Sequence, residues 1–205
     1  RQVMDQVVRH VAGRVPVIIG ISEQSLPRVL VEAEAAQKSG ADILLATPPY
    51  SYPISHELII DYFRQLSSNT RLPIILYNNA ETGNLLGVNA VQTISQIPGI
   101  IGVKEFSDFG HLQQLINKVQ RLGEFVILSG DEYLFAPALL IGAEYSTMGG
   151  PGNLVPQWCV QMHRLAKTGD WDKLSQLHRR LVMFCDALYG VGESAYSAVL
   201  AALSI

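Results

Sequence analysis

The sequence has 205 residues, of which 48% are hydrophobic and 16% charged, and its formal net charge is −3. This length suffices for one substantial core, and the small negative charge argues against nucleic acid as a partner. No apolar stretch approaches the roughly 20 residues that cross a bilayer, so we expect no membrane partner and take a cytoplasmic location as the default.

The predicted elements alternate between short apolar runs and amphipathic segments, after an opening helix over residues 1–13. Six runs have the composition of buried strands. They cover residues 15–22, 41–49, 72–79, 100–106, 124–131 and 143–150. Helical patterns lie between them, at residues 25–40, 55–70, 89–97, 109–123 and 132–142, and the tail from about residue 156 is also helical.

This alternation predicts an α/β fold, for which two closures are possible. A doubly wound sheet would usually carry a glycine-rich turn after its first strand, and the sequence has no GxGxxG motif. The other closure is a TIM (β/α)8 barrel, which typically takes about 250 residues. Six units fit a barrel whose first two strands are missing from this chain. We therefore expect one barrel domain over residues 1–205, with extra C-terminal helices from about residue 156.

Two polar side chains end neighbouring predicted strands. Tyr77 ends "PIILY" and Lys104 ends "IIGVK". If these strands start level, both side chains point to one face at one height, about 4.8 Å apart, because strand faces alternate with a period of two. A lysine that forms a Schiff base needs such a nearby proton donor. A structural lysine would instead pair with Glu105 or Asp131, and the spacing leaves both interpretations open.

Polar or glycine-rich sequences follow other predicted strands, at the end where barrel active sites lie. "ATPPYSYP" follows the second run, "LSGDEY" ends the fifth and "MGGPGN" ends the sixth. Prolines stiffen the first loop, and glycines let backbone approach a ligand in the last. Each motif alone is also ordinary loop sequence. The positions concerned are Thr47, Tyr50, Ser129, Gly130, Asp131, Gly149 and Gly150.

Together these segments resemble the dihydrodipicolinate synthase / N-acetylneuraminate lyase family of class I aldolase-type barrels. The matching segments are "VPVIIGIS", "GADILLATPPY", "LPIILYNN", "GIIGVKEFSD", "FVILSGDE" and "NLVPQ", in the family's order. The resemblance implies a lyase that binds a 2-oxo acid, usually pyruvate or a pyruvate-derived sugar acid, as an imine on Lys104. It also implies that Tyr77 relays protons and that Tyr50 acts across a subunit interface.

The resemblance further implies a homotetramer built as a dimer of dimers. No cofactor is expected, because the protonated imine is itself the electron sink. No metal is expected either, because the five histidines form no HxH or HExxH pattern, and we expect all five on helix surfaces. The substrate-binding positions it implies are Thr47, Glu81, Thr82, Ser129, Gly130, Asp131, Gly149 and Gly150.

The sequence also departs from the family pattern. The segment "GTTGE", whose threonine pair anchors the substrate carboxylate, does not occur in the chain and is expected before Arg1. "YNNAETG" carries Glu81 where dihydrodipicolinate synthases usually have an arginine that binds a semialdehyde carboxylate, and like charges there would repel that substrate. We therefore predict an aldolase or dehydratase of 2-keto-3-deoxy sugar acids. Dihydrodipicolinate synthase is one alternative, and an inactive regulatory or pyruvate-sensing member is another.

Overall fold

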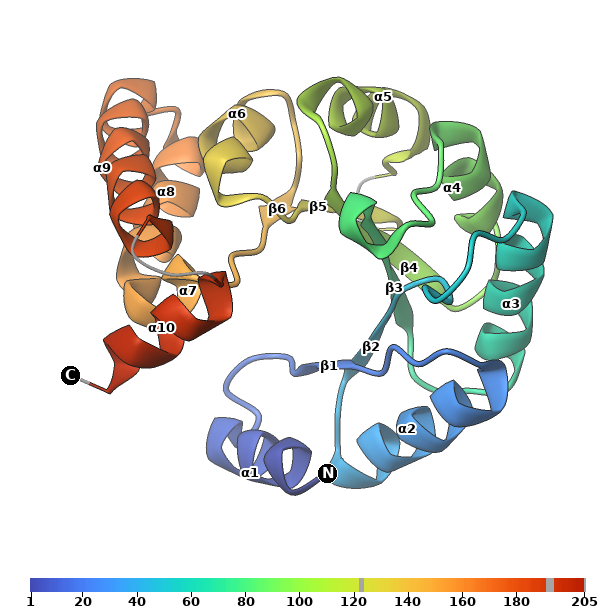
Figure 1. The fold of residues 1–205 in the computed structure, drawn as a ribbon. Coiled ribbons are helices and arrows are strands. Elements are labelled where there is room, and N and C mark those ends of the chain that lie inside the picture. Colours follow the sequence, from blue (N-terminus) through green and yellow to red (C-terminus); the bar gives the residue numbers. More distant parts are fainter. Residues whose placement is uncertain (122–123, 191–193, 205) are drawn as a thin grey trace. The chain divides into compact units, whose positions relative to one another are not determined.

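The computed structural model describes residues 1–121, 124–190 and 194–204. Two compact units make up the chain, Arg1–Ile127 and Leu128–Ile205, and each joins strands to helices (Figure 1). Neighbouring strands are hydrogen-bonded in chain order, and the recorded pairs are parallel. The predicted α/β alternation is confirmed.

The first unit alternates strands with helices along the chain. Its elements are α1 (Gln2–Val11), β1 (Ile18–Gly20), α2 (Leu26–Ser39), β2 (Ile43–Ala46), α3 (His56–Ser68), β3 (Ile74–Asn79), η1 (Ala80–Thr82), α4 (Val88–Ile94), β4 (Ile100–Phe106), α5 (Phe109–Val119) and the start of β5 (Val126–Ser129). Each apolar run holds its strand, and strand pairing covers only the central residues of most runs. Residues 122–123, at the end of the pattern predicted for 109–123, lie outside the described residues.

Local sequence explains where several of these helices begin and end. Ser55 precedes α3 and accepts a hydrogen bond from the Leu58 amide at 3.4 Å, and Asp108 caps α5 by accepting from the His111 amide at 3.0 Å. These caps satisfy amides that have no partner within their helix. Gly40 ends α2 at a φ of 89°, a left-handed conformation that favours glycine.

One side of the strands in the first unit is covered by helices. Figure 1 shows α2, α3, α4 and α5 on the outer side of β1–β4. Their apolar stripes are buried there, because side chains at helical spacing meet the strand surface. In α3 the buried residues are Ile59, Tyr62, Phe63 and Leu66. The helix-free side of these strands is therefore where polar strand-end residues can meet a ligand.

The register between β3 and β4 contains one irregularity. Ile74 pairs with Ile100, whereas Ile75 pairs with Gly102, so Ile101 is an extra residue in β4. The expectation that the two strands start level, with Pro73 opposite Ile100, is therefore wrong, because Ile74 lies opposite Ile100. After this bulge the offset is the one expected, and Tyr77 pairs with Lys104.

The second unit is mostly helical. It contains the end of β5, then η2 (Glu132–Leu134), α6 (Phe135–Leu140), β6 (Tyr145–Ser146), α7 (Pro151–Leu154), α8 (Pro156–Thr168), α9 (Trp171–Tyr189) and α10 (Ala195–Leu203). β6 pairs in parallel with β5 through Tyr145 and Ser146. Its core is a cluster of buried side chains from α6, α8 and α9, formed by Phe135, Ala136, Met162, Leu174, Leu177, Leu181 and Cys185.

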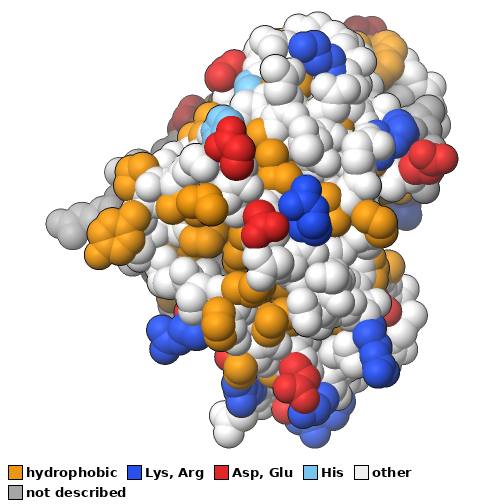
Figure 2. Space-filling model, turned by 90° about the vertical axis from the view of Figure 1, so that its right-hand side faces the viewer, with side chains coloured by type: hydrophobic (Ala, Val, Ile, Leu, Met, Phe, Trp, Pro, Cys, Tyr) orange, Lys and Arg blue, Asp and Glu red, His pale blue; other side chains and the backbone are white. Residues whose placement is uncertain are grey.

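The surface drawn in Figure 2 carries charges of both signs. Lysine and arginine side chains alternate with acidic ones, and hydrophobic side chains lie between them. A face of this kind has no field of one sign, in keeping with the net charge of −3. Among the described residues, no helix is both long and apolar enough to span a membrane.

Candidate active site

The site is built around Lys104 and Tyr77, near the carboxyl ends of β4 and β3. The two residues are register partners, and the lysine Nζ lies 4.2 Å from the centroid of the tyrosine ring. Both side chains are half-buried. The predicted proximity of amine and phenol is confirmed. The face of an aromatic ring attracts a cation, so the ring holds the amine in one place when it is charged.

A glycine next to this pair lets the following strand approach closely. Gly102 lies two residues before Lys104 and pairs with Ile75. A Cβ atom on Gly102 would stand 2.6 Å from the Val126 carbonyl oxygen and 2.7 Å from Val126 Cγ2. No Cβ atom fits at such distances, so the β4 backbone beside the lysine requires glycine.

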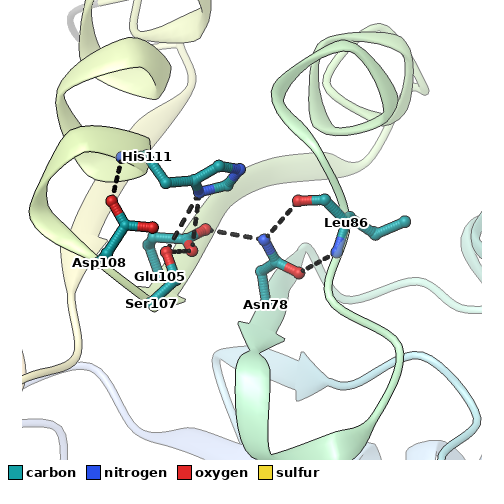
Figure 3. A network of polar contacts seen from close by, with 6 residues as sticks. All are labelled: Asn78, Leu86, Glu105, Ser107, Asp108 and His111. Atoms are coloured by element: carbon teal, nitrogen blue, oxygen red, sulfur yellow. Dashed lines mark hydrogen bonds and ion pairs between the residues drawn. The ribbon is translucent and has the colours of Figure 1, made fainter.

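Glu105 points to the other face of β4, as alternation requires. Its Oε2 accepts a hydrogen bond from Asn78 Nδ2 at 2.9 Å, and its Oε1 accepts from Ser107 Oγ at 2.5 Å and faces His111 Nδ1 at 3.1 Å (Figure 3). The carboxylate thus belongs to a network on the helix side of β4.

His111 corrects one of our sequence expectations, because it is not a solvated helix-surface residue. Its side chain is only 15% exposed and forms an ion pair with Glu105. The hydrogen bond that the imidazole donates to Glu105 raises the pKa of His111, and the Asp108 charge adds to this, whereas burial opposes it. The sequence prediction failed because the Glu105 partner comes from another element.

The loop after β2 places two of the predicted residues. Thr47 is 5% exposed, its amide donates to Ser22 Oγ at 3.1 Å, and its own Oγ1 has no hydrogen-bond partner among the described residues. Tyr50 is 40% exposed. Asn84 fixes this loop: its Nδ2 donates to the carbonyls of Pro49 and Tyr52 at 2.7 and 2.9 Å.

The loop after β3 places Glu81 and Thr82. Glu81 is exposed and its amide donates to Asn79 Oδ1 at 2.8 Å, and Thr82 Oγ1 donates to the Asn79 carbonyl at 2.8 Å. Asn79 Nδ2 also reaches Tyr77 Oη at 3.4 Å. The loop that carries the predicted specificity residue therefore begins beside the phenol.

The remaining predicted positions lie in the second unit, where Ser129 ends β5 and Gly130 follows it, and both are buried. Ser129 Oγ has no hydrogen-bond partner among the described residues. Asp131 Oδ1 accepts from the Tyr133 amide at 2.8 Å, and burial raises the pKa of the Asp131 carboxyl while this bond opposes the rise. Gly149 is exposed.

A side-chain clamp holds Gly150 in the second unit. Glu132 Oε1 accepts from the Gly150 amide at 3.1 Å and from Tyr189 Oη at 3.0 Å. A Cβ atom on Gly150 would stand 2.0 Å from that phenol oxygen, so any other residue here would have to displace the Tyr189 side chain. The glycine-rich turn is thus fixed by a carboxylate and a phenol.

Sequence reasoning missed the residues that hold the predicted positions within each unit, three in the first unit and Glu132 in the second. Asn78, Asn84, His111 and Glu132 act through contacts with distant segments, and only "YNN" and "TGN" gave a local signal, as short turn-forming asparagines. Among the described residues, no group of three or more His, Cys, Asp or Glu side chains is arranged to hold a metal ion.

Parallel βα units bring a lysine and a tyrosine together near the carboxyl ends of adjacent strands, where parallel α/β proteins carry their active sites. Comparison with known proteins identifies the family. The model of the dihydrodipicolinate synthetase family matches residues 1–205, and the chain belongs to this family of lyases.

Curated relatives include two bacterial proteins named 4-hydroxy-tetrahydrodipicolinate synthase. The chain is 33% identical to the protein from Neisseria meningitidis serogroup B over 204 residues, 96% of this chain and 69% of the relative. It is 33% identical to the protein from Desulfotalea psychrophila over 185 residues, 88% of this chain and 61% of the relative. The chain thus spans between about three fifths and seven tenths of these relatives.

Solved structures of the same family also match this chain. Dihydrodipicolinate synthase from Bacteroides thetaiotaomicron matches with a TM-score of 0.92 and 27% identity, over 99% of this chain and 70% of that one. YagE from Escherichia coli K12, a member of the same family in complex with pyruvate, matches with a TM-score of 0.92 and 28% identity, over 99% and 69%. The fold is therefore the parallel α/β arrangement of these proteins.

Proposed function

We propose that this protein is a Schiff-base-forming lyase that acts on pyruvate or a pyruvate-derived 2-oxo acid. The observation that carries the proposal is the pairing of Lys104 with Tyr77, with the amine 4.2 Å from the ring centroid. Family membership and the pyruvate complex of the Escherichia coli relative support the choice of a 2-oxo acid. We also propose that the parallel strands form part of a (β/α)8 barrel.

In the proposed reaction the neutral amine of Lys104 attacks the 2-oxo carbon of the substrate. The resulting carbinolamine loses water, so the carbonyl oxygen leaves as H2O and a protonated C=N bond remains. This cation accepts the electron pair of the bond that breaks at the neighbouring carbon. Tyr77 moves protons to and from the substrate hydroxyl, and Asn79, whose Nδ2 lies 3.4 Å from its Oη, orients the phenol.

The substrate is the point on which two candidates differ. Glu81 is exposed in the loop that follows Tyr77, and its carboxylate disfavours an anionic semialdehyde. This supports 2-keto-3-deoxy sugar acids, with cleavage or dehydration of a neutral hydroxylated chain. The names of the curated relatives favour the second candidate, 4-hydroxy-tetrahydrodipicolinate synthase.

The proposal is tested by trapping the imine. The protein from its full-length gene is incubated with pyruvate, reduced with borohydride, and mapped by mass spectrometry. We expect one adduct, on Lys104, that Lys104→Arg abolishes and Lys118→Arg, at an exposed lysine of α5, leaves unchanged. The absence of an adduct on Lys104 would contradict the proposal and favour a structural lysine.

The substrate is then decided by turnover assays. Activity on 2-keto-3-deoxy sugar acids that exceeds condensation of pyruvate with aspartate semialdehyde supports the first candidate. The reverse ranking supports the second. We expect Glu81→Arg to move the preference towards the semialdehyde. An adduct on Lys104 without turnover of either class would indicate a pyruvate-binding protein.

We also propose a homotetramer in which Tyr50 reaches the site of a neighbouring subunit. The 40% exposure of Tyr50 leaves its ring available for such a contact. Light scattering after size-exclusion chromatography measures the assembly. A monomer with full activity would remove this role.

A further inference from the structure

The residues that follow Tyr77 and Lys104 are themselves register partners, Asn78 with Glu105. Because strand faces alternate, this second pair lies on the face of β3 and β4 away from the amine. Asn78 is 0% and Glu105 2% exposed. We propose that Glu105 and His111 are positioning residues for the reaction proposed above: they fix the β3–β4 register from behind and so keep the lysine amine beside the tyrosine ring.

The hydrogen bonds of Glu105 satisfy its buried carboxylate on both oxygens. Both carboxylate oxygens have donors, Asn78 on Oε2, and Ser107 and His111 on Oε1. A buried carboxylate without such partners would be strongly unfavourable, so these donors are required by the burial of the group. Figure 3 shows Glu105 between the imidazole on one side and the Asn78 amide on the other.

The β3–β4 register needs contacts that fix it, because β4 has an extra residue. Ile101 has no register partner in β3, and the pairing changes between Ile74 and Ile75. A shift of one residue beyond the bulge would turn Lys104 to the helix side, since every side chain would change face. The bond from Asn78 to Glu105 joins the two strands beyond the bulge, one pair after the reacting residues.

The same network reaches the loop that carries Glu81 and Thr82. Asn78 Nδ2 donates to the Leu86 carbonyl at 3.0 Å, and Asn78 Oδ1 accepts from the Leu86 amide at 2.8 Å. Asn78 therefore closes the loop that starts at η1. One carboxylate thus connects the lysine strand, the tyrosine strand and the loop between β3 and α4.

The charge of His111 determines the strength of its hydrogen bond to Glu105, the carboxylate that connects β3, β4 and the loop before α4. The charged groups that face the imidazole are Glu105 from β4 and Asp108 from the N-cap of α5, both acidic. The contacts from Ser107, and from Asn78 and Leu86 to the same network, are uncharged. A protonated imidazole gives a charge-assisted bond to Glu105, which is stronger than a neutral one. The hydrogen bond between His111 and Glu105 is therefore stronger at low pH than at high pH, and it fixes the β3–β4 register more firmly there.

The test compares wild-type protein with His111→Asn, whose amide can still donate to Glu105 but carries no charge. The rate of borohydride-trapped imine formation on Lys104 with pyruvate is measured from pH 6 to pH 9, on protein shown to be folded by circular dichroism. His163→Asn, at a half-buried histidine of α8, is the matched control.

We expect the wild-type rate to exceed that of His111→Asn by about tenfold at pH 6, since small misplacements of reacting groups can cost on the order of a hundredfold. The ratio should fall towards one as His111 loses its proton, because both proteins then have a neutral donor. Using the ratio cancels the ionisations of the reacting groups themselves. His163→Asn should match wild type at every pH.

A ratio that stays within twofold of one at every pH would overturn the positioning role and leave the proposed function intact. A ratio that is constant with pH would also overturn it, because general damage to the fold does not follow the His111 charge. Ser107→Ala, which removes one donor to Glu105, should slow trapping by about twofold to threefold. This variant keeps the inference testable if His111→Asn does not fold. An unchanged trapping rate in Ser107→Ala would count against the positioning role. The absence of a wild-type adduct on Lys104 would overturn the proposed function and this inference together.

Discussion

The two faces of the β3–β4 pair differ in what they do with polar groups. On the helix-free face, Lys104 and Tyr77 are half-buried and meet through an amine and a ring face. On the helix side, Asn78 and Glu105 are buried, and both Glu105 oxygens have hydrogen-bond partners. The same two strands thus present one face with a half-buried amine and phenol, and one on which both Glu105 oxygens have donors while His111 Nε2 has no hydrogen-bond partner among the described residues.

This difference separates reactivity from support. A group that must form and break bonds with a substrate has to be accessible to that substrate. A group that holds geometry is most effective when every donor and acceptor is satisfied, because an unsatisfied buried group is costly. Variants on the first face should therefore change the chemistry directly, and variants on the second face should change stability and, through the position of the amine, the rate of imine formation.

The sharpest test of the reactive face is Tyr77→Phe. The ring remains, so the contact with Lys104 is kept and imine trapping should stay within a few-fold of wild type. Loss of the phenol should lower turnover by about 10²- to 10⁴-fold, the usual contribution of a general acid or base. Steady-state kinetics and borohydride trapping together measure this split.

The control for this variant is Tyr62→Phe in α3. Tyr62 is buried and its hydroxyl has no hydrogen-bond partner among the described residues, so its loss should leave turnover unchanged. Equal losses of trapping and turnover in Tyr77→Phe would assign Tyr77 to packing rather than proton transfer.

Glu105→Ala tests the helix-side face of β3 and β4. Removal of the carboxylate leaves Asn78, Ser107 and His111 without their buried acceptor, and breaking a buried ion pair typically costs about 3–5 kcal/mol. Urea denaturation measures the free energy of unfolding. Glu124→Ala removes an exposed partner of Arg121 and should change that energy by less than about 1 kcal/mol. Similar values for the two variants would mean that the Glu105 network contributes little.

Close packing beside the lysine is tested by Gly102→Ala. The new Cβ atom would stand 2.6 Å from the Val126 carbonyl oxygen, and relieving such overlap usually costs about 1–3 kcal/mol. Gly20→Ala in β1 is the matched control, since a Cβ atom there meets nothing within 4 Å. Thermal melting of both variants is the measurement, and equal melting temperatures would contradict the close approach of β4 and Val126.

The smallest expected effect is the pH dependence of stability. The pKa of His111 is raised in the folded protein, so its contribution is complete below the unfolded value of about 6.5 and is lost as pH rises through the folded value. The unfolding free energy of wild type should therefore decline relative to His111→Asn above pH 6.5. The decline should be on the order of 1 kcal/mol, the difference between a charged and a neutral hydrogen bond. Parallel pH profiles would show that His111 is not ionised in the fold.

Much of the secondary structure was predictable from local pattern. Isoleucine-rich runs gave β3 and β4 because short buried strands need apolar residues on both faces. β6 has only two residues, Tyr145 and Ser146, although the predicted run had eight, because strand pairing depends on the neighbouring strand and not on the run itself.

The sequence by itself determined the order of the elements and the family, because these follow from periodicity and from motifs with a fixed spacing. The pairing of Tyr77 with Lys104 depends in addition on the bulge, since the pairing of Ile74 with Ile100 would otherwise place Tyr77 opposite Val103. Tertiary structure alone decided the bulge at Ile101, the clamp on Gly150 and the burial of His111 against Glu105. These features depend on hydrogen bonds and close approaches between segments far apart in the chain. A local pattern carries no information on such partners, since it records which residues are apolar and not which of them meet.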